Sequence, residues 1–134
     1  MPCLDTTVLI DLRRARGAGA RAEAALRRLV RNGERLTTTR INEAEFRVGI
    51  YLSTDAAKEQ AHVERVLAPL EILEFSAASA DQYAVLKARQ MTPGRPVGDM
   101  DLLIAAIVLS ADQTLLTGNP RHFAEIPGLV VESY

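Results

Sequence analysis

Short apolar or β-branched runs alternate along the chain with longer segments of helical spacing. The runs predict strands at residues 1–5, 35–39, 70–75, 114–117 and 129–132. The segments between them predict helices at residues 8–12, 20–30, 41–52, 55–67, 77–91 and 99–110. Residues 92–98 contain two prolines and two glycines and are expected to form a loop. Because strands separated by helices pair in parallel through right-handed crossovers, the pattern predicts an α/β fold. We expect a three-layer α/β/α sandwich around a mainly parallel sheet.

The composition is typical of a globular protein with no membrane-spanning segment. The chain has 134 residues, of which 48% are hydrophobic and 25% charged, and we expect one globular domain spanning residues 1–134. A net charge of -1 gives no global basic field, so any RNA contact must come from local basic patches or bound cations. Residues 1–10 do not read as a signal peptide, and no apolar stretch is long enough to span a bilayer. These features predict a cytoplasmic location with no membrane partner.

Asp5 follows the first predicted strand directly. Ligands of open parallel sheets bind beyond the carboxyl ends of the strands, which makes this carboxylate a candidate functional group. Aspartate before a helix is also a common N-cap, and the sequence leaves both interpretations open.

Glu45 lies on the predicted helix 41–52. The expected apolar stripe of that helix is formed by Ile41, Ala44, Val48 and Leu52. Glu45 falls within the stripe, whereas Glu43 and Arg47 are expected on the opposite side. A buried carboxylate is costly unless it is paired or coordinates a metal, which favours a functional role for Glu45. The alternative is that it lies at the stripe edge and reaches water or an arginine.

Asp99 and Asp101 open a predicted helix that is apolar nearly all round and therefore expected to be buried. Acidic residues in a first turn interact favourably with the helix dipole, and one of them is explained by capping alone. The second is less well explained. Together with Asp5 and Glu45, these residues offer the carboxylate oxygens that Mg²⁺ and Mn²⁺ prefer, and the bound ion would activate water for phosphodiester hydrolysis.

Four ordered segments then resemble the motifs of one family. Residues 4–11 resemble the first motif of PIN-domain ribonucleases of the VapC type, the toxins of type II toxin–antitoxin pairs, with Asp5 at the metal-ligand position. Residues 39–49 resemble the second motif, in which a glycine follows the acidic ligand by four positions; Gly49 thus selects Glu45 over Glu43. Residues 96–106 are similar to the third motif, with Asp101 as the ligand. Residues 115–123 and 126–129 resemble the closing segment.

The resemblance implies a PIN-like fold and an Mg²⁺- or Mn²⁺-dependent endoribonuclease. It implies that Asp5, Glu45 and Asp101 are the catalytic and metal-binding residues, and the auxiliary candidates are Thr6, Asn42, Asp99 and Asn119. Many PIN domains carry a fourth acidic residue where this chain has Asn119, which favours a single metal ion over a strict two-metal site. The implied partners are an RNA substrate, a VapB-like antitoxin and a second copy of the chain.

Candidate RNA contacts are few. Arg13 and Arg14 follow Asp5 closely, and Arg121 lies in the closing segment, so these three are the candidates; most other arginines of the first quarter are expected on solvated helix faces. His122 is expected to be structural or a phosphate contact. Aromatic content of 4% makes a broad base-stacking platform improbable.

The sequence bears on three other functions. Phosphatases with a nucleophilic aspartate carry Asp-x-Asp after the first strand, and this chain has Thr7 at the second position. A non-catalytic PIN-like interaction module often loses acidic positions, but three remain here. A PIN-domain nuclease of general RNA processing, outside any toxin–antitoxin pair, stays open.

Overall fold

The computed structural model describes residues 1–90 and 97–134, so the predicted loop lies outside the described residues except for Val97 and Gly98. Its strands are β1 (Pro2–Leu4), β2 (Thr37–Thr39), β3 (Glu71–Leu73), β4 (Thr114–Leu116) and β5 (Val131–Glu132). They form one sheet in the order β3-β2-β1-β4-β5, and every pairing is parallel. The predicted parallel sheet is confirmed.

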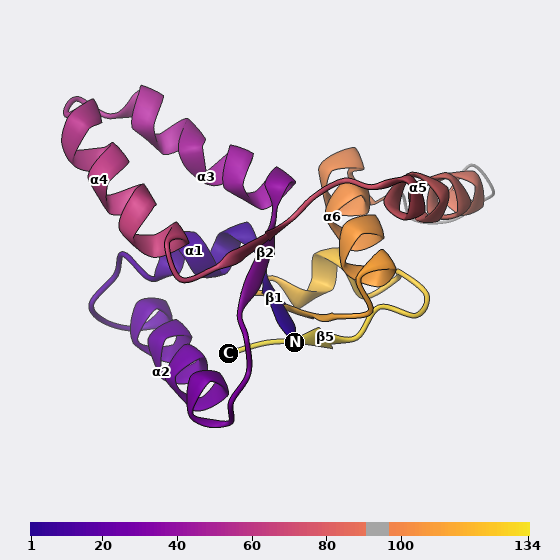
Figure 1. Ribbon diagram of the computed structural model, residues 1–134, viewed down its shortest axis with the longest axis horizontal. Helices are drawn as coiled ribbons and strands as arrows, with labels where there is room; N and C mark the ends of the chain where they lie inside the picture. Colours follow the sequence, from indigo (N-terminus) through magenta and orange to yellow (C-terminus); the bar gives the residue numbers. More distant parts are fainter. Residues whose placement is uncertain (91–96) are drawn as a thin grey trace.

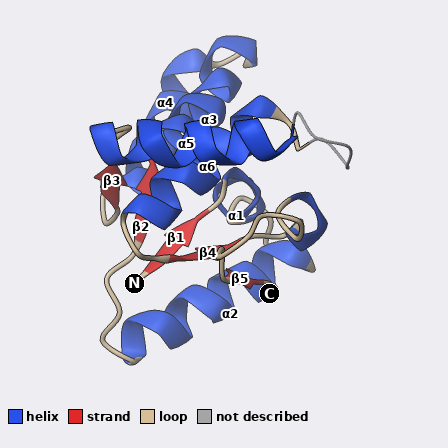
Figure 2. Ribbon diagram, turned by 90° about the vertical axis from the view of Figure 1, so that its right-hand side faces the viewer, coloured by secondary structure: helices blue, strands red, loops and turns tan. Residues whose placement is uncertain are grey.

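Helices connect the strands. They are α1 (Thr6–Asp11), α2 (Ala18–Arg31), α3 (Arg40–Leu52), α4 (Ala56–Leu67), α5 (Ala77–Gln90) and α6 (Asp99–Ser110), with the short 3₁₀ helix η1 (Pro120–His122) after β4. Figure 1 shows α1 to α4 on one side of the strands and α5 and α6 on the other. Figure 2 views the sheet from the side of α5 and α6 and shows its strands spread out from β3 to β5. This is the predicted α/β/α sandwich.

Side chains of the central strands point alternately to the two faces of the sheet, and a hydrophobic core lies on each face. Successive strand residues point to opposite faces of a sheet. Leu4 and Leu116 accordingly pack with α1, α2, α3 and α4, whereas Cys3 and Leu115 pack with α5, α6 and the segment around Phe123. All four of these strand residues are fully buried. The central strands β1 and β4 are therefore fixed from both sides, and so are the residues that follow them.

The predicted buried face of helix 41–52 is wrong. The buried residues of α3 are Asn42, Glu43, Phe46 and Ile50, whereas Val48 is 53% exposed and Leu52 is 80% exposed. The helix packs through the face that carries Phe46 and Ile50, because those side chains meet α1 and α4 in the core. Apolar spacing alone could not distinguish the two faces.

The third strand is shorter than predicted. Residues 70–75 were expected to be extended, but β3 covers only Glu71–Leu73 and pairs with β2 along its whole length. Phe75 lies beyond it and is 43% exposed. Within the described ranges, no helix combines the length and the apolar character needed to cross a bilayer.

Candidate active site

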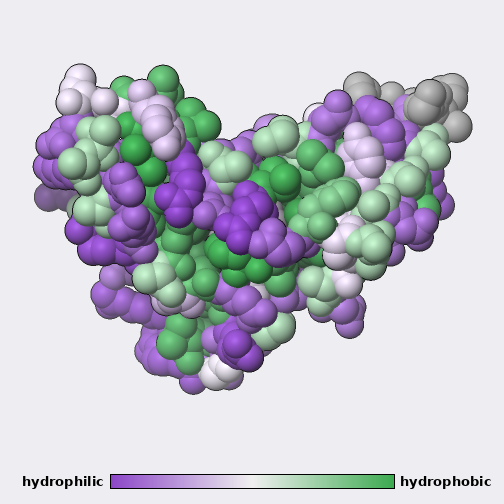
Figure 3. Space-filling view, turned by 45° about the horizontal axis from the view of Figure 1, so that its top comes forward, coloured by the Kyte–Doolittle hydropathy of each residue, from purple (hydrophilic) through white to green (hydrophobic). Residues whose placement is uncertain are grey.

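The candidate residues lie at the carboxyl edge of the central strands. Asp5 follows β1, α3 begins directly after β2, and Thr117 follows β4. Because β1 pairs in parallel with both β2 and β4, these three strand ends lie side by side. Figure 3 shows the surface hollowed between the part formed by α3 and α4 and the part formed by α5 and α6, with hydrophilic side chains in the hollow.

Asp5 is a buried carboxylate with several donors. It occupies the N-cap position of α1, yet its side chain makes no capping hydrogen bond. Instead, Oδ1 accepts from Asn42 Nδ2 at 3.0 Å, and Oδ2 accepts from Thr117 Oγ1 at 2.7 Å and from Thr7 Oγ1 at 3.1 Å. The Asp5 side chain is 5% exposed. Its carboxylate is thus oriented by side chains from three elements, and simple helix capping does not account for it.

Asn42 and Thr6 connect Asp5 to Glu45. The first turn of α3 is closed by a capping box, in which Asn42 N donates to Thr39 Oγ1 at 3.1 Å and Thr39 Oγ1 donates to Asn42 Oδ1 at 2.7 Å. This fixes the Asn42 amide so that Nδ2 faces Asp5 and also donates to Thr6 Oγ1 at 3.0 Å. Thr6 Oγ1 in turn donates to Glu45 Oε1 at 2.7 Å. Two auxiliary candidates therefore join the two carboxylates in one hydrogen-bonded chain.

Glu45 and Asp101 lie within electrostatic range of Asp5. Burial raises the pKa of Glu45, the Thr6 hydrogen bond lowers it, and the charges of Asp5 and Asp101 raise it further. Burial likewise raises the pKa of Asp101, which is opposed by His122 and reinforced by Asp5. The charge of Asp5 thus acts unfavourably on both of the other carboxylates, and a cation placed among the three would relieve this repulsion.

The donor set suits a hard divalent cation. Carboxylate oxygens come from three different elements, with threonine and asparagine groups around them. In the part of the chain that the structure describes, no three acidic, histidine or cysteine side chains are arranged so that together they could hold a metal ion. Mg²⁺ typically uses one or two carboxylates and keeps several waters, so an open arrangement of this kind fits its coordination habits.

Glu43 serves another purpose than Glu45. It is 8% exposed and forms ion pairs with Arg40 and with Arg47, whose Nε lies 2.9 Å from Glu43 Oε1. Arg40 also binds Glu74, beyond β3. Glu43 therefore lies in a charge network that joins α3 to the neighbouring strand end, whereas Glu45 lies with Asp5.

Other candidates lie apart from the cluster. Asp99 pairs with Lys87 Nζ at 2.7 Å, and that contact lowers the Asp99 pKa. Arg13 forms an ion pair with Glu59, and Arg14 lies 3.5 Å from Asp11. Gly98, not an aspartate, takes the N-cap position of α6, so the capping interpretation applies to neither Asp99 nor Asp101.

Thr7 and Thr117 were not among the sequence candidates. Both hydroxyls donate to Asp5, and Thr117 Oγ1 accepts from the backbone N of Asn119 at 3.0 Å. The Asn119 side chain makes no capping bond to η1. Thr117 follows β4 just as Asp5 follows β1, so the rule of the strand ends could have identified it.

The segment after β4 closes over α1. Gly118 N donates to Thr7 Oγ1 at 2.8 Å, and a Cβ at Gly118 would lie 2.6 Å from the hydroxyl of Tyr134. That hydroxyl donates to Asp11 Oδ2 at 2.7 Å, and burial together with Asp11 raises the Tyr134 pKa. A larger residue at Gly118 would therefore have to displace the end of the Tyr134 side chain.

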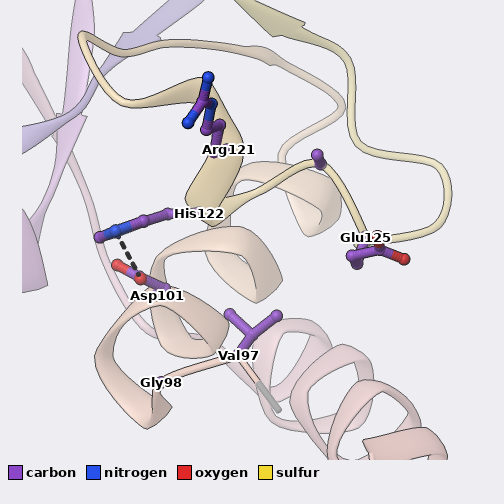
Figure 4. Close-up of a pocket in the computed structure, with 7 residues that line it drawn as sticks. Val97, Gly98, Asp101, Arg121, His122 and Glu125 are labelled. Carbon is purple, nitrogen blue, oxygen red and sulfur yellow. Dashed lines mark ion pairs between the residues drawn. The ribbon is translucent and has the colours of Figure 1, made fainter. Parts of the chain in front are cut away.

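A cavity of about 540 Å³ borders the cluster beside Asp101. His122 Nδ1 lies 3.4 Å from Asp101 Oδ2, and Arg121 also borders the cavity (Figure 4). Within the described residues Arg121 forms no ion pair, in contrast to Arg13 and Arg14. Arg121 is thus the most available of the three candidate RNA contacts.

Comparisons with known proteins agree on one family. The model of the PIN domain matches residues 3–129. The chain is 31% identical over 131 residues to ribonuclease VapC19 of Mycobacterium tuberculosis, covering 96% of this chain and 97% of that protein. It is 33% identical over 91 residues to ribonuclease VapC2 of Rickettsia felis, covering 68% of each. A solved structure of VapBC2 from Rickettsia felis, bound to a promoter DNA fragment, is similar with a TM-score of 0.89 at 27% identity, covering 99% of this chain and 98% of that one.

Proposed function

This chain belongs to the PIN-domain family, and we propose that it is a divalent-metal-dependent endoribonuclease, the toxin of a VapBC-type toxin–antitoxin pair. One observation carries the proposal. Asp5 stands at a helix N-cap position but makes no capping bond, and it is held by Asn42, Thr7 and Thr117 within range of two half-buried acids. An aspartate that served only as a helix cap would not require these hydrogen bonds to its carboxylate.

The ion that we propose is Mg²⁺ or Mn²⁺, bound through oxygens of Asp5, Glu45 and Asp101 with water in the remaining positions. Nucleases of the PIN-domain VapC type generally depend on divalent metal ions. The bound ion would lower the pKa of a water molecule and stabilise the charge that develops on the phosphate. Asn119, at the place of a fourth acid, supports a single ion.

The residues of the chain supply orientation and charge. Thr7, Thr117 and Asn42 fix both oxygens of Asp5, so that carboxylate needs no reorganisation when a cation arrives. Thr6 directs one oxygen of Glu45 and leaves the other available. Asp101 contributes its carboxylate from the first turn of α6, and burial together with the charge of Asp5 raises its pKa.

RNA contact is proposed at the open side of this cluster. Arg121 is exposed beside Asp101 and is the proposed phosphate contact, because arginine forms strong paired hydrogen bonds with phosphate. Arg13 and Arg14 are assigned a smaller role, since each already faces an acidic side chain. The auxiliary role of Asp99 is reduced to holding Lys87.

The proposed protein partners are a VapB-like antitoxin and a second copy of the chain. Solved structures similar to this chain include complexes with antitoxins, which supports the first. Exposed apolar side chains at the end of α3, Tyr51 at 86% and Leu52 at 80%, support a protein contact there. We place the activity in the cytoplasm, where its RNA substrate is made and used.

The direct test is cleavage of a mixed RNA substrate by the purified protein. We expect cleavage with Mg²⁺ or Mn²⁺, none with a chelator, and none with Asp5→Asn or Glu45→Gln. Asp81→Asn, an exposed acid on α5 outside the cluster, is the matched control and should cleave like the wild type. Cleavage that survives chelation, or that both active-site variants retain, would contradict the proposal.

The toxin role is tested separately from the chemistry. Expression of the chain should arrest growth, and co-expression of the antitoxin encoded beside it should relieve the arrest and co-purify. RNA cleavage without either effect would favour a nuclease of general RNA processing.

A further inference from the structure

The cavity beside Asp101 has two chemically different ends. One end is the Asp101–His122 pair, and the other is Glu125, on the opposite side of the view (Figure 4). Val97 and Ala124 also line the cavity. Its volume of about 540 Å³ lies in the range of small-ligand sites, roughly 300–1,000 Å³.

The Asp101 end is continuous with the proposed catalytic cluster. If Asp101 holds an ion that binds the scissile phosphate, the adjoining nucleotide would lie next to His122, which is 3.4 Å from Asp101. The apolar surfaces of Val97 and Ala124 and the flat ring of His122 suit an unstacked base, as in most proteins that recognise single-stranded RNA. The cavity therefore offers space and surface for one base beside the cleaved bond.

Glu125 is the unusual member of the lining. It is exposed, and among the residues that the structure describes it has no hydrogen bond and no ion pair. Its carboxylate repels phosphates, so it cannot serve as a backbone contact. An ionised carboxylate is purely an acceptor, and the neutral donors that RNA presents are its 2′-hydroxyls and the N–H groups of its bases. Every nucleotide carries the same 2′-hydroxyl, so a carboxylate that distinguishes nucleotides must do so through base N–H groups.

We propose that this cavity binds a guanine base of the nucleotide next to the scissile phosphate and that Glu125 determines this specificity. Guanine presents two adjacent donors, N1–H and the N2 amino group, which match the two oxygens of one carboxylate. Adenine and cytosine present one amino group beside an acceptor nitrogen, and uracil presents one N–H between two carbonyl oxygens. The inference rests on the proposed endoribonuclease activity and adds the identity of a base that it reads.

Cleavage-site sequencing on a randomised single-stranded RNA pool tests the proposal. In the wild type with Mg²⁺, guanine should be enriched at one position adjoining the cleaved bond, by about tenfold over uracil, since hydrogen bonds to a charged group commonly contribute this much or more. Glu125→Gln keeps the size of the side chain, and Glu125→Ala removes it; both should lose that enrichment and still cleave other sites. Asp81→Asn, with the same change of charge as Glu125→Gln, should keep the wild-type profile.

A binding measurement on the metal-free protein separates the two proposals. Guanosine 5′-monophosphate should shift the backbone amide resonances of Ala124 and Glu125 at about tenfold lower concentration than uridine 5′-monophosphate, and Glu125→Gln should abolish the difference. No cleavage of any RNA by the wild type would end the proposed function, whatever the nucleotide binds. Cleavage whose base profile is the same in wild type and both Glu125 variants would overturn the guanine site alone. Binding of the free guanosine nucleotide with that unchanged profile would also overturn it, because the site would then not read RNA.

Discussion

Two sides of the same cluster differ in how firmly they are held. Around Asp5, side chains from α1, α3 and the end of β4 donate to both carboxylate oxygens. On the other side, the one contact that Asp101 makes among the described side chains is the longer 3.4 Å contact with His122, and the Asp101 side chain is 27% exposed. One side of the site is therefore preorganised, and the other is free to adjust to an ion and a substrate. The difference implies that changes at Asp5 act on geometry and charge together, whereas changes at Asp101 act on charge.

The two aspartates of α6 should differ most clearly in their effect on RNA cleavage, and Asp101→Asn has the largest expected effect. Asp101→Asn should lower the rate of RNA cleavage by at least about a hundredfold, because a charge that holds the metal ion is worth several kcal/mol in the transition state. Asp99→Asn removes an exposed ion pair with Lys87 and weakens a long, 3.5 Å hydrogen bond from Tyr83, and the rate should stay within about twofold of the wild type. Single-turnover rates on one RNA oligonucleotide measure both. Equal losses would mean that the two positions are not functionally distinct.

Loss of one hydrogen-bond donor to Asp5 should weaken both metal binding and the stability of the fold. Thr117→Val keeps the shape of the side chain and removes the 2.7 Å hydrogen bond to Asp5. We expect Mn²⁺ affinity to fall by about tenfold to a hundredfold, as for other residues that orient metal ligands. The cost in unfolding free energy should be about 1–3 kcal/mol, because a buried acceptor loses a partner. Calorimetric Mn²⁺ titration and chemical denaturation separate the two effects, and unchanged Mn²⁺ affinity would contradict the role given to Thr117.

The two glutamates of α3 should affect different properties: Glu43 the stability of the fold, and Glu45 the binding of the metal ion. Glu43→Gln breaks ion pairs with Arg40 and Arg47 and should lower stability by about 1–3 kcal/mol, with Mn²⁺ affinity unchanged. Glu45→Gln should do the reverse, lowering Mn²⁺ affinity at little cost to folding. Parallel denaturation curves and Mn²⁺ titrations of the two variants check this. A fall in Mn²⁺ affinity for Glu43→Gln as large as for Glu45→Gln would remove the distinction.

The smallest expected effect is a pH dependence of the metal-free protein. The pKa values of Glu45 and Asp101 are raised on folding, so the folded state binds these protons more tightly than the unfolded state. Their contribution to stability is then most favourable below the unfolded pKa, and it declines as pH rises through the raised folded values. Without metal, Glu45→Gln should therefore have a slightly higher Tm than the wild type at pH 7 and lose that advantage in acid. A lower Tm at pH 7 would show that the carboxylate is stabilised by partners.

Much of this arrangement could be predicted from the sequence. The alternation of strands and helices predicted the parallel sheet, and the rule of the strand ends singled out Asp5. The helical-face argument for Glu45 was wrong in its premise, because α3 buries Phe46 and Ile50 and leaves Val48 exposed. A single helix cannot reveal which of two apolar faces its neighbours will cover.

The strand-end rule could have identified Thr117 as a residue, but its hydrogen bond to Asp5 could not be predicted from the sequence, for a different reason. Thr117 and Asp5 are separated by 112 positions, and their contact depends on the register between β1 and β4. Asn42 reaches Asp5 only because Thr39 closes the first turn of α3 around it. Such contacts follow from tertiary packing, which no local pattern encodes.

The most direct test of the central claim is a Mn²⁺ titration of the wild type and four variants. The account predicts one bound ion in the wild type and affinities lower by about tenfold or more in Asp5→Asn, Glu45→Gln and Asp101→Asn, since affinity follows the number of charged ligands. Asp99→Asn should bind like the wild type. Equal affinity in all five proteins would contradict the assignment of Asp5, Glu45 and Asp101 to one metal site.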